Sequence, residues 1–475
     1  MSKNLIETKP KIGFMTIGLN AYWAQFEGIK DNIISYHDKL VNKFGDYCTL
    51  VDSGLVDTVQ TSVKAGQLFR SQDVDIVFCH TATYSPSANL LPAIKDLDVP
   101  VIFLNVQCIK SLDMDAVSTI DEWLGNGFTC ACVPEMVAVC RRTGKRYGVI
   151  TGFLEGDNVV DREIKKWCLA AGVRCRLRNT GVALLGRPYP GMMDLYIDET
   201  NLFKKLGCYT QYIEWDDIKN ELPKVSAADA DKMADMVLDT FYIEGNTSEK
   251  KLGDLPAIIC ALERIALKYN VTAMASHYAG DPKGEDAIIF SALNPAFSIL
   301  INEGISSAVE GDIKAALAMT ILRTIGGSAT LAEMYSMDFN NDICLIGHSG
   351  SGDPAVSVSK KPLMKISEVF HGKTTGGYLT QFYPEFGDVT MLALTQDETG
   401  SYRMVAVKGK CLDGPVLKLG DTNSRVAFSC GLREFVNKWS SFGPTHHGVL
   451  GLGDHIDTLK KVAIALDIPL DIVCE

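Results

Sequence analysis

Hydrophobic runs alternate with amphipathic segments through the first third of the chain. Apolar runs typical of buried strands occupy residues 11–17, 48–55, 74–80, 99–106 and 146–151. Segments with apolar residues at helical spacing stand between them, at residues 22–44, 58–70, 87–95, 134–143 and 159–171. This alternation predicts a parallel sheet with helices on both faces. We therefore expect an N-terminal α/β domain, Rossmann- or flavodoxin-like, over residues 1–175.

The same alternation continues through the middle of the chain. Helical spacing recurs at residues 227–240, 255–269, 293–303 and 312–325, with strand-like runs at 271–278 and 306–309. A loop rich in turn residues, Gly186–Asp194, precedes them. The pattern predicts a second α/β domain with a doubly wound parallel sheet over residues 176–326.

The last third changes character after Gly326 and Gly327. Strand-like alternation of apolar and polar residues appears at 389–394, 403–410 and 424–429, and a helical pattern at 457–465. We expect a mostly antiparallel C-terminal domain over residues 327–475, built as a barrel or a sandwich.

Composition and charge narrow the classes of function. The chain has 475 residues and a net charge of −12, and we find no block of like charge in it. A nucleic acid or an anionic membrane is therefore not an expected partner. No G-x-G-x-x-G follows the first strand, so a dinucleotide site is not indicated.

The N-terminal sequence, the lengths of the apolar runs and the cysteine pattern indicate in which cellular compartment we expect the protein. The N-terminus has no signal-peptide core, and no apolar run reaches membrane-spanning length. The 14 cysteines include no C-x-x-C pair. We expect buried free thiols in a reducing compartment, and hence a cytoplasmic protein.

Two carboxylates and two imidazoles form the candidate chemical centre. Glu310 stands between an apolar strand and a helix, and Glu333 follows that helix. His348 ends an apolar run, and His447 lies in the later sequence P-T-H-H-G. A mixed oxygen and nitrogen set suits manganese, cobalt or zinc better than calcium. Taken singly, the same residues could be a helix cap, a helix-surface residue, a core histidine and a turn residue.

Polar residues at predicted strand ends are candidates for binding a ligand. Asn20 and Tyr22 follow the first strand, and Thr83 follows the third. Ligands of parallel sheets bind at the carboxyl ends of the strands. Capping or turn formation is the alternative role for these residues.

A glycine- and serine-rich turn after His348 offers a competing interpretation. Gly347-His348-Ser349-Gly350-Ser351 nearly forms the G-x-S-x-G elbow of serine hydrolases, with Ser349 as nucleophile. The final position of the motif is serine, and Pro354 disfavours helix at Asp353. The match to a hydrolase elbow is therefore incomplete.

Several of these motifs resemble the L-arabinose isomerase family, in its divergent part that adjoins the L-fucose isomerases. E-G-D-I-K-A-A-L at 310–317 is similar to the family's E-G-D-W-K-T-A-A-L, and Glu333 in A-E-M-Y to the glutamate of M-E-D-Y. His348 in L-I-G-H and His447 in T-H-H resemble the family's two histidine motifs. The family's N-Q-T-A-H-G-G corresponds to Asn126-Gly127-Phe128-Thr129-Cys130-Ala131-Cys132, which has no histidine.

The resemblance implies a metal-dependent aldose–ketose isomerase that acts through an enediol or enediolate. Glu310, Glu333, His348 and His447 would hold Mn²⁺ or another divalent ion such as Co²⁺, and the two glutamates would transfer protons. It implies the three-domain fold of L-fucose and L-arabinose isomerases, and a homohexamer or tetramer with active sites at subunit contacts. The residues expected to bind the sugar are Asn20, Tyr22, Thr83, Arg187, Met193 and His446.

These motifs do not specify which sugar is the substrate. Arg187 is a candidate for binding an anionic substrate, such as a sulfonated sugar of the sulfoquinovose kind or a phosphorylated one; an ordinary surface arginine is the favoured alternative. Besides the serine hydrolase, a non-catalytic sugar-binding protein is a further alternative, although it leaves the glutamate and histidine set unexplained.

Overall fold

The computed structural model describes residues 5–125, 130–245, 252–367, 376–415, 417–418 and 421–474. Its contacts group the chain into two compact units. We call residues 8–176 with 460–467 the N-terminal unit, and residues 1–7, 177–459 and 468–475 the main unit. The main unit holds both a parallel and an antiparallel sheet, and the predicted boundary between two domains near residue 326 stays a prediction.

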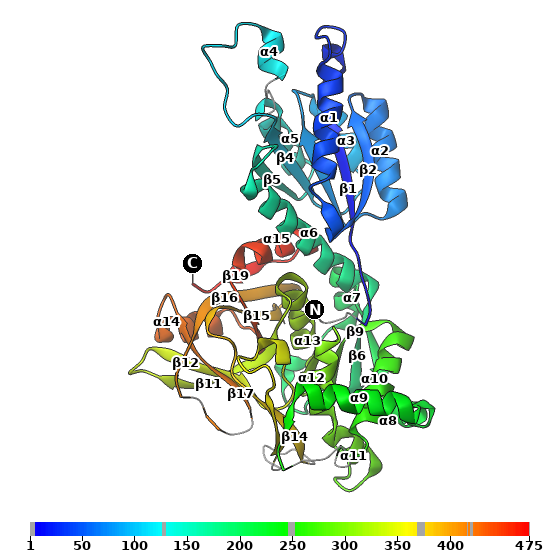
Figure 1. The fold of residues 1–475 in the computed structure, drawn as a ribbon, viewed down its shortest axis with the longest axis vertical. Coiled ribbons are helices and arrows are strands. Elements are labelled where there is room, and N and C mark those ends of the chain that lie inside the picture. Colours follow the sequence, from blue (N-terminus) through cyan, green and yellow to red (C-terminus); the bar gives the residue numbers. More distant parts are fainter. Residues whose placement is uncertain are drawn as a thin grey trace. The chain divides into compact units, whose positions relative to one another are not determined.

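The N-terminal unit is built around a five-stranded parallel sheet in the order β2-β1-β3-β4-β5 (Figure 1). This is the order of flavodoxin-like folds. Its strands are β1 (Lys11–Ile17), β2 (Thr49–Val56), β3 (Ile76–Thr81), β4 (Val101–Gln107) and β5 (Tyr147–Phe153). Its helices are α1 (Ile29–Val41), α2 (Val59–Gln72), α3 (Leu91–Ile94), α4 (Ile120–Gly125), α5 (Val133–Arg142) and α6 (Asn158–Asn179).

Both faces of this sheet are buried, because neighbouring strand residues point into two separate cores. Met15 packs with residues of α2, α3 and α5 on one face, and Phe14 packs with residues of α1 and α6 on the other. The first helix is shorter than predicted, since Gly28 precedes it in a left-handed conformation with φ 76°. Asn20 and Tyr22 instead form a short 3₁₀ helix after β1.

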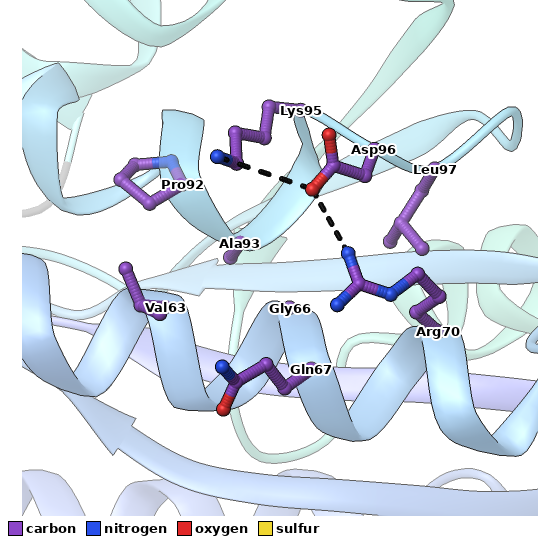
Figure 2. A pocket seen from close by; sticks show the side chains of 9 residues that line it. All are labelled: Val63, Gly66, Gln67, Arg70, Pro92, Ala93, Lys95, Asp96 and Leu97. Atoms are coloured by element: carbon purple, nitrogen blue, oxygen red, sulfur yellow. Dashed lines mark hydrogen bonds and ion pairs between the residues drawn. The ribbon is translucent and has the colours of Figure 1, made fainter.

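A small pocket of about 100 Å³ lies between α2 and α3 of this unit (Figure 2). Arg70 and Lys95 both point at Asp96 across it, at 2.9 and 4.0 Å. The lining of this pocket includes no histidine, no cysteine and no second carboxylate, so it offers no set of groups suited to chemistry.

The main unit contains a four-stranded parallel sheet in the order β10-β9-β6-β7. Its strands are β6 (Gly181–Gly186), β7 (Tyr209–Ile213), β9 (Val271–His277) and β10 (Ser306–Val309). The helices are α7 (Glu199–Leu206), α8 (Trp215–Glu221), α9 (Ala227–Thr240), α10 (Leu255–Tyr269), α11 (Glu285–Ser291), α12 (Leu293–Asn302) and α13 (Ile313–Gly326).

A mixed seven-stranded sheet follows, in the order β15-β18-β11-β12-β17-β16-β19, and β15 also pairs with β16. Its strands are β11 (Thr330–Asp338), β12 (Ile343–His348), β15 (Gly387–Gln396), β16 (Tyr402–Leu412), β17 (Thr422–Phe428), β18 (Gly448–Leu452) and β19 (Leu470–Ile472). A smaller sheet joins β8 (Tyr242–Ile243), β13 (Leu363–Ser367) and β14 (Gly377–Gln381). The two late helices are α14 (Leu432–Ser441) and α15 (Ile456–Leu466). The predicted α/β fold is thus confirmed as two parallel sheets and a mixed sheet.

Helix α13 joins the two kinds of sheet within the main unit. It is mostly apolar and almost entirely buried, and it contacts β9 and β10 as well as β15 and β18. A helix that is hydrophobic all round is stable only in such a surrounded position. Its N-terminus therefore lies where the carboxyl edge of the parallel sheet meets the antiparallel strands.

Two further observations bear on the predictions about cysteines and membranes. Cys430 and Cys474 form a disulfide, so the expectation of free thiols is wrong for this pair. Eleven other cysteines whose side chains the structure describes lie outside any disulfide, and all of them except Cys108 are buried. No helix within the described ranges is long and apolar enough to cross a membrane.

Candidate metal centre

Glu310 is held in a strained turn directly after β10. Its φ of 62° lies in the left-handed region, which non-glycine residues seldom adopt outside functional or tightly constrained positions. Tyr189 donates its backbone N–H to the carbonyl of Glu310 at 2.8 Å, and Gly311 donates to Ser276 at 2.9 Å. A Cβ on Gly311 would lie 2.5 Å from the carbonyl oxygen of Arg187. Glycine at 311 therefore lets the β6 loop pack against this turn.

Glu333 and His348 lie on the neighbouring strands β11 and β12. Glu333 pairs with Gly347 in the antiparallel register, which places it beside His348. A Cβ on Gly347 would come within 1.8 Å of the carbonyl oxygen of Thr422 on β17, so this position requires glycine. The alternative role of Glu333 as a helix-surface residue is wrong, because the residue belongs to a strand.

His447 is buried just before β18 and is held by Asp312, the N-cap residue of α13. Its Nδ1 donates to Asp312 Oδ2 at 3.0 Å, and Asp312 Oδ1 also accepts from Ala315 N at 2.9 Å. Asp312, and not Glu310, is thus the residue that caps α13. The helix N-terminus and His447 are fixed by one carboxylate.

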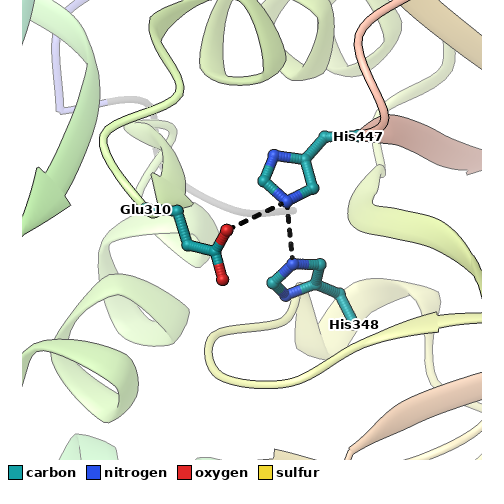
Figure 3. Close-up of side chains that lie close together, drawn as sticks. All are labelled: Glu310, His348 and His447. Atoms are coloured by element: carbon teal, nitrogen blue, oxygen red, sulfur yellow. Dashed lines mark hydrogen bonds and ion pairs between the residues drawn. The ribbon is translucent and has the colours of Figure 1, made fainter. Parts of the chain in front are cut away.

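The side chains of these three segments converge (Figure 3). His348 Nε2 and His447 Nε2 lie 3.1 Å apart, and Glu310 Oε2 lies 3.6 Å from His447 Nε2. Glu333 Oε1 lies 4.0 Å from His348 Nε2. Glu310, His348 and His447 form one group spaced for holding a metal ion, and Glu333, His446 and His447 form a second, overlapping one.

The hydrogen bonds of the two histidines show that this arrangement fits a cation. His348 Nδ1 faces the carbonyl oxygen of Ser349 at 2.7 Å, and His447 Nδ1 faces Asp312. Both partners are acceptors, so each Nδ1 carries the hydrogen, and each Nε2 presents a lone pair to the other. Two lone pairs at 3.1 Å repel unless a proton or a metal ion lies between them. Neutral imidazoles oriented by acceptors are the usual ligands of divalent metals.

The electrostatic environment also favours a cation. Burial lowers the pKa of His447, but the hydrogen bond and charge of Asp312, with the charges of Glu310 and Glu333, leave the net pKa raised. Burial raises the pKa of Glu333, although His447 and His446 oppose that shift. A carboxyl group with a raised pKa is suited to exchanging protons near neutral pH.

Three of the residues predicted to bind substrate belong to the main unit, which also holds this centre. His446 is adjacent to His447, and its Nε2 lies 4.0 Å from Glu310 Oε2. Arg187 is exposed at the end of β6, where Gly186 pairs with His277 of β9. Met193 starts a 3₁₀ turn (Met193–Leu195) and is 76% exposed.

The other three lie in the N-terminal unit. Asn20 and Tyr22 follow β1, and Thr83 follows β3. Thr83 Oγ1 accepts from the backbone N–H of Leu19 at 3.1 Å, which joins the ends of these two strands. Residues 126–129 of the segment compared with the family's histidine motif lie outside the described residues.

The serine-hydrolase elbow is not formed. An elbow needs a helix directly after the nucleophile, whereas irregular backbone follows Ser349 until a short 3₁₀ turn (Pro354–Val356). His348 hydrogen-bonds the backbone oxygen of Ser349.

Sequence reasoning missed three carboxylates around the centre. Asp312 orients His447, Asp194 binds His446, and Asp421 accepts a hydrogen bond from Tyr335 at 3.1 Å. Asp312 could have been found, because E-G-D before a helix is a capping signal. Asp194 and Asp421 carry no local signal, since their partners are distant in the sequence.

Comparison with known proteins finds isomerases. No protein-family model matches the chain. A sulfoquinovose isomerase of Alkalicoccus urumqiensis is 21% identical over 62% of this chain and 65% of its own length. An L-arabinose isomerase of Levilactobacillus brevis is 22% identical over 78% of both chains, and one of Klebsiella pneumoniae subsp. pneumoniae 20% over 84% of this chain and 80% of its own. All three similar proteins are isomerases, which is consistent with an enzyme of that class.

Proposed function

We propose that the chain is a metal-dependent aldose–ketose isomerase that acts on a free or anionic sugar through an enediol or enediolate. The observation that carries the proposal is the convergence of His348 Nε2 and His447 Nε2, 3.1 Å apart, with Glu310 and Glu333 beside them. The three isomerases to which the chain is similar support the same reaction class.

The residues that would hold the ion are Glu310, Glu333, His348 and His447. Two carboxylates and two imidazoles suit Mn²⁺ or Co²⁺. A divalent ion held there would supply a Lewis acid that stabilises negative charge developing on the substrate. Asp312 and the carbonyl of Ser349 hold the two imidazoles in the tautomer that such binding needs.

The two glutamates are the groups available to move the proton. Isomerisation removes a proton from C2 and delivers one to C1, while the O2 hydroxyl proton passes to O1, so no external oxidant is needed. A free glutamate is a weak base for a proton beside a carbonyl. Burial raises the pKa of Glu333, which brings this carboxyl closer to the range useful for general acid–base catalysis.

The strand pairing supports a barrel for the antiparallel part. Strands β15, β18, β11, β12, β17 and β16 pair in turn, and β16 pairs again with β15 over its whole length. A ladder that returns to its first strand is the condition for a closed barrel. In this arrangement Glu333, His348 and His447 come from three neighbouring strands or their ends.

The substrate and the assembly are proposed more broadly. The sugar is an aldose related to those named for the similar isomerases, with Arg187 available for an anionic group. Asn20, Tyr22, Thr83, Met193 and His446 are proposed to contact the sugar. The assembly is proposed to be a homohexamer or tetramer with active sites at subunit interfaces.

A turnover screen tests the proposal. Purified protein is assayed with Mn²⁺ before and after EDTA, against pentoses, hexoses, 6-deoxy sugars and 6-sulfo- or 6-phospho-sugars. Ketose formation that EDTA removes and Mn²⁺ restores is the expected result. Sugar binding without turnover would favour a sugar-binding protein. No turnover and no metal by elemental analysis would reject the four-residue centre.

A further inference from the structure

Asp194 makes a contact that neither the metal centre nor the proton transfer described above uses. Its Oδ2 accepts two hydrogen bonds from His446, from the backbone N–H at 3.0 Å and from Nδ1 at 2.7 Å. One carboxylate oxygen therefore fixes both the position of this residue's backbone and the orientation of its ring.

The loop that carries Asp194 is itself anchored to α13. Lys314 is only 3% exposed, and its Nζ donates to the backbone oxygens of Asp194 at 2.5 Å and of Tyr196 at 3.0 Å. Because these bonds involve the backbone, they persist whatever side chain stands at position 194. The same helix turn carries Asp312, which holds His447.

The adjacent histidines are thus each held at Nδ1 by a different aspartate. His447 is buried with Nε2 in the metal centre, whereas the side chain of His446 is 37% exposed. Since Asp194 accepts from Nδ1, the neutral ring of His446 would present the lone pair of Nε2, which lies 4.0 Å from Glu310 Oε2. Two acceptors at that distance leave room for a donor between or beside them, as a sugar hydroxyl would supply.

From this geometry we infer that Asp194 is a positioning residue, which holds His446 Nε2 as a hydrogen-bond acceptor for a hydroxyl group of the substrate. The inference rests on the proposed isomerase function and adds a residue to it. Asp194 does not touch the substrate; it acts through His446. The ligand chemistry is that of a polyhydroxylated substrate with a donor hydroxyl close to the ion-binding group.

Asp194→Ala tests this role, with Asp198→Ala as the matched control. Asp198 lies in the same segment but only caps α7, through Thr200 and Asn201. In Asp194→Ala we expect KM for the sugar to rise roughly tenfold, the scale of one lost charge-assisted hydrogen bond, with a smaller change in kcat. Mn²⁺ affinity, measured by titration calorimetry without sugar, should stay within about twofold of wild type. Asp194→Asn keeps an acceptor oxygen, so its KM should lie between the values of the wild type and of Asp194→Ala.

A double-mutant cycle separates this role from a merely structural one. In a His446→Ala background, Asp194→Ala should cause no further rise in KM, because its only route to the substrate is gone. Three results would each overturn the inference: an unchanged KM in Asp194→Ala, an undiminished effect of Asp194→Ala in the His446→Ala background, or loss of Mn²⁺ binding in Asp194→Ala. In each case, turnover by the wild-type protein would still support the proposed function. Wild-type protein with neither turnover nor bound metal would overturn both.

Discussion

At the scale of single residues, Glu333 is the carboxyl group best placed to exchange a proton. Burial raises its pKa, and it stands beside His348 on the paired strand. Glu333→Gln keeps the size and the oxygen ligand but cannot carry a proton. We expect kcat to fall by at least about 100-fold, as for loss of a general acid or base. The exposed Glu434, which pairs with Lys438 on α14, provides the control variant Glu434→Gln. Full activity in Glu333→Gln would remove this residue from proton transfer.

Asp312 is the residue that we expect to set the affinity of the proposed metal centre. It accepts from His447 Nδ1 and also caps α13 through Ala315 N. Asn is an equally good helix cap, so Asp312→Asn changes the histidine contact while sparing the cap. We expect Mn²⁺ affinity to drop by about 10- to 100-fold, the usual cost of losing the outer partner of a histidine ligand. Competition with a chelator measures it, and unchanged affinity would show that Asp312 serves the helix alone.

At the scale of elements, the turn between β10 and α13 determines where Glu310 points. Gly311 has φ 74°, and an added Cβ would meet Arg187 and Pro188; Gly327 at the other end of α13 has φ 84° and open space around it. Gly311→Ala should therefore destabilise the protein by about 1–3 kcal/mol more than Gly327→Ala, which adds only backbone strain. Thermal unfolding measures the stability of the two variants. We expect the loss of stability to be accompanied by weaker Mn²⁺ binding only in Gly311→Ala. Equal losses would mean that the β6 loop adapts freely.

Several elements coincide with their predicted ranges and others do not, which shows the parts of the structure that local sequence signals determine. Strand β10 and helices α9 and α10 coincide with the predicted ranges, because their apolar periodicity and caps are local signals. Glu333 was open to interpretation as a helix residue, because L-A-E-M-Y fits both periods and only pairing with β12 decides. The convergence of Glu310, His348 and His447 depends on the pairing of β11 with both β12 and β18, and on the contacts of α13 with β10 and β18. Long-range pairing of this kind leaves no mark in the sequence around any one of them.

At the scale of the whole molecule, the centre links segments that are far apart along the chain. Glu310 follows the parallel sheet, while Glu333 and His348 belong to the mixed sheet and His447 directly precedes its strand β18, so an ion held by all four would tie these two layers of the main unit together. A ligand that binds only the folded state stabilises it by mass action, by about 2.7 kcal/mol when its concentration is 100-fold above Kd.

We therefore expect Mn²⁺ to raise the unfolding temperature of the main unit, and EDTA to lower it again. Calorimetry resolves whether one or both of the compact units respond, and the N-terminal unit, which contributes none of the four residues, should show no shift of its own. His348→Gln supplies the control. Its unfolding temperature without metal can be lower than that of the wild type, but Mn²⁺ should no longer raise it. Mg²⁺, which prefers oxygen ligands, should shift the wild-type transition far less than Mn²⁺ at the same concentration. A shift of equal size with both ions, or one that survives in His348→Gln, would place the stabilising ion outside the imidazole pair.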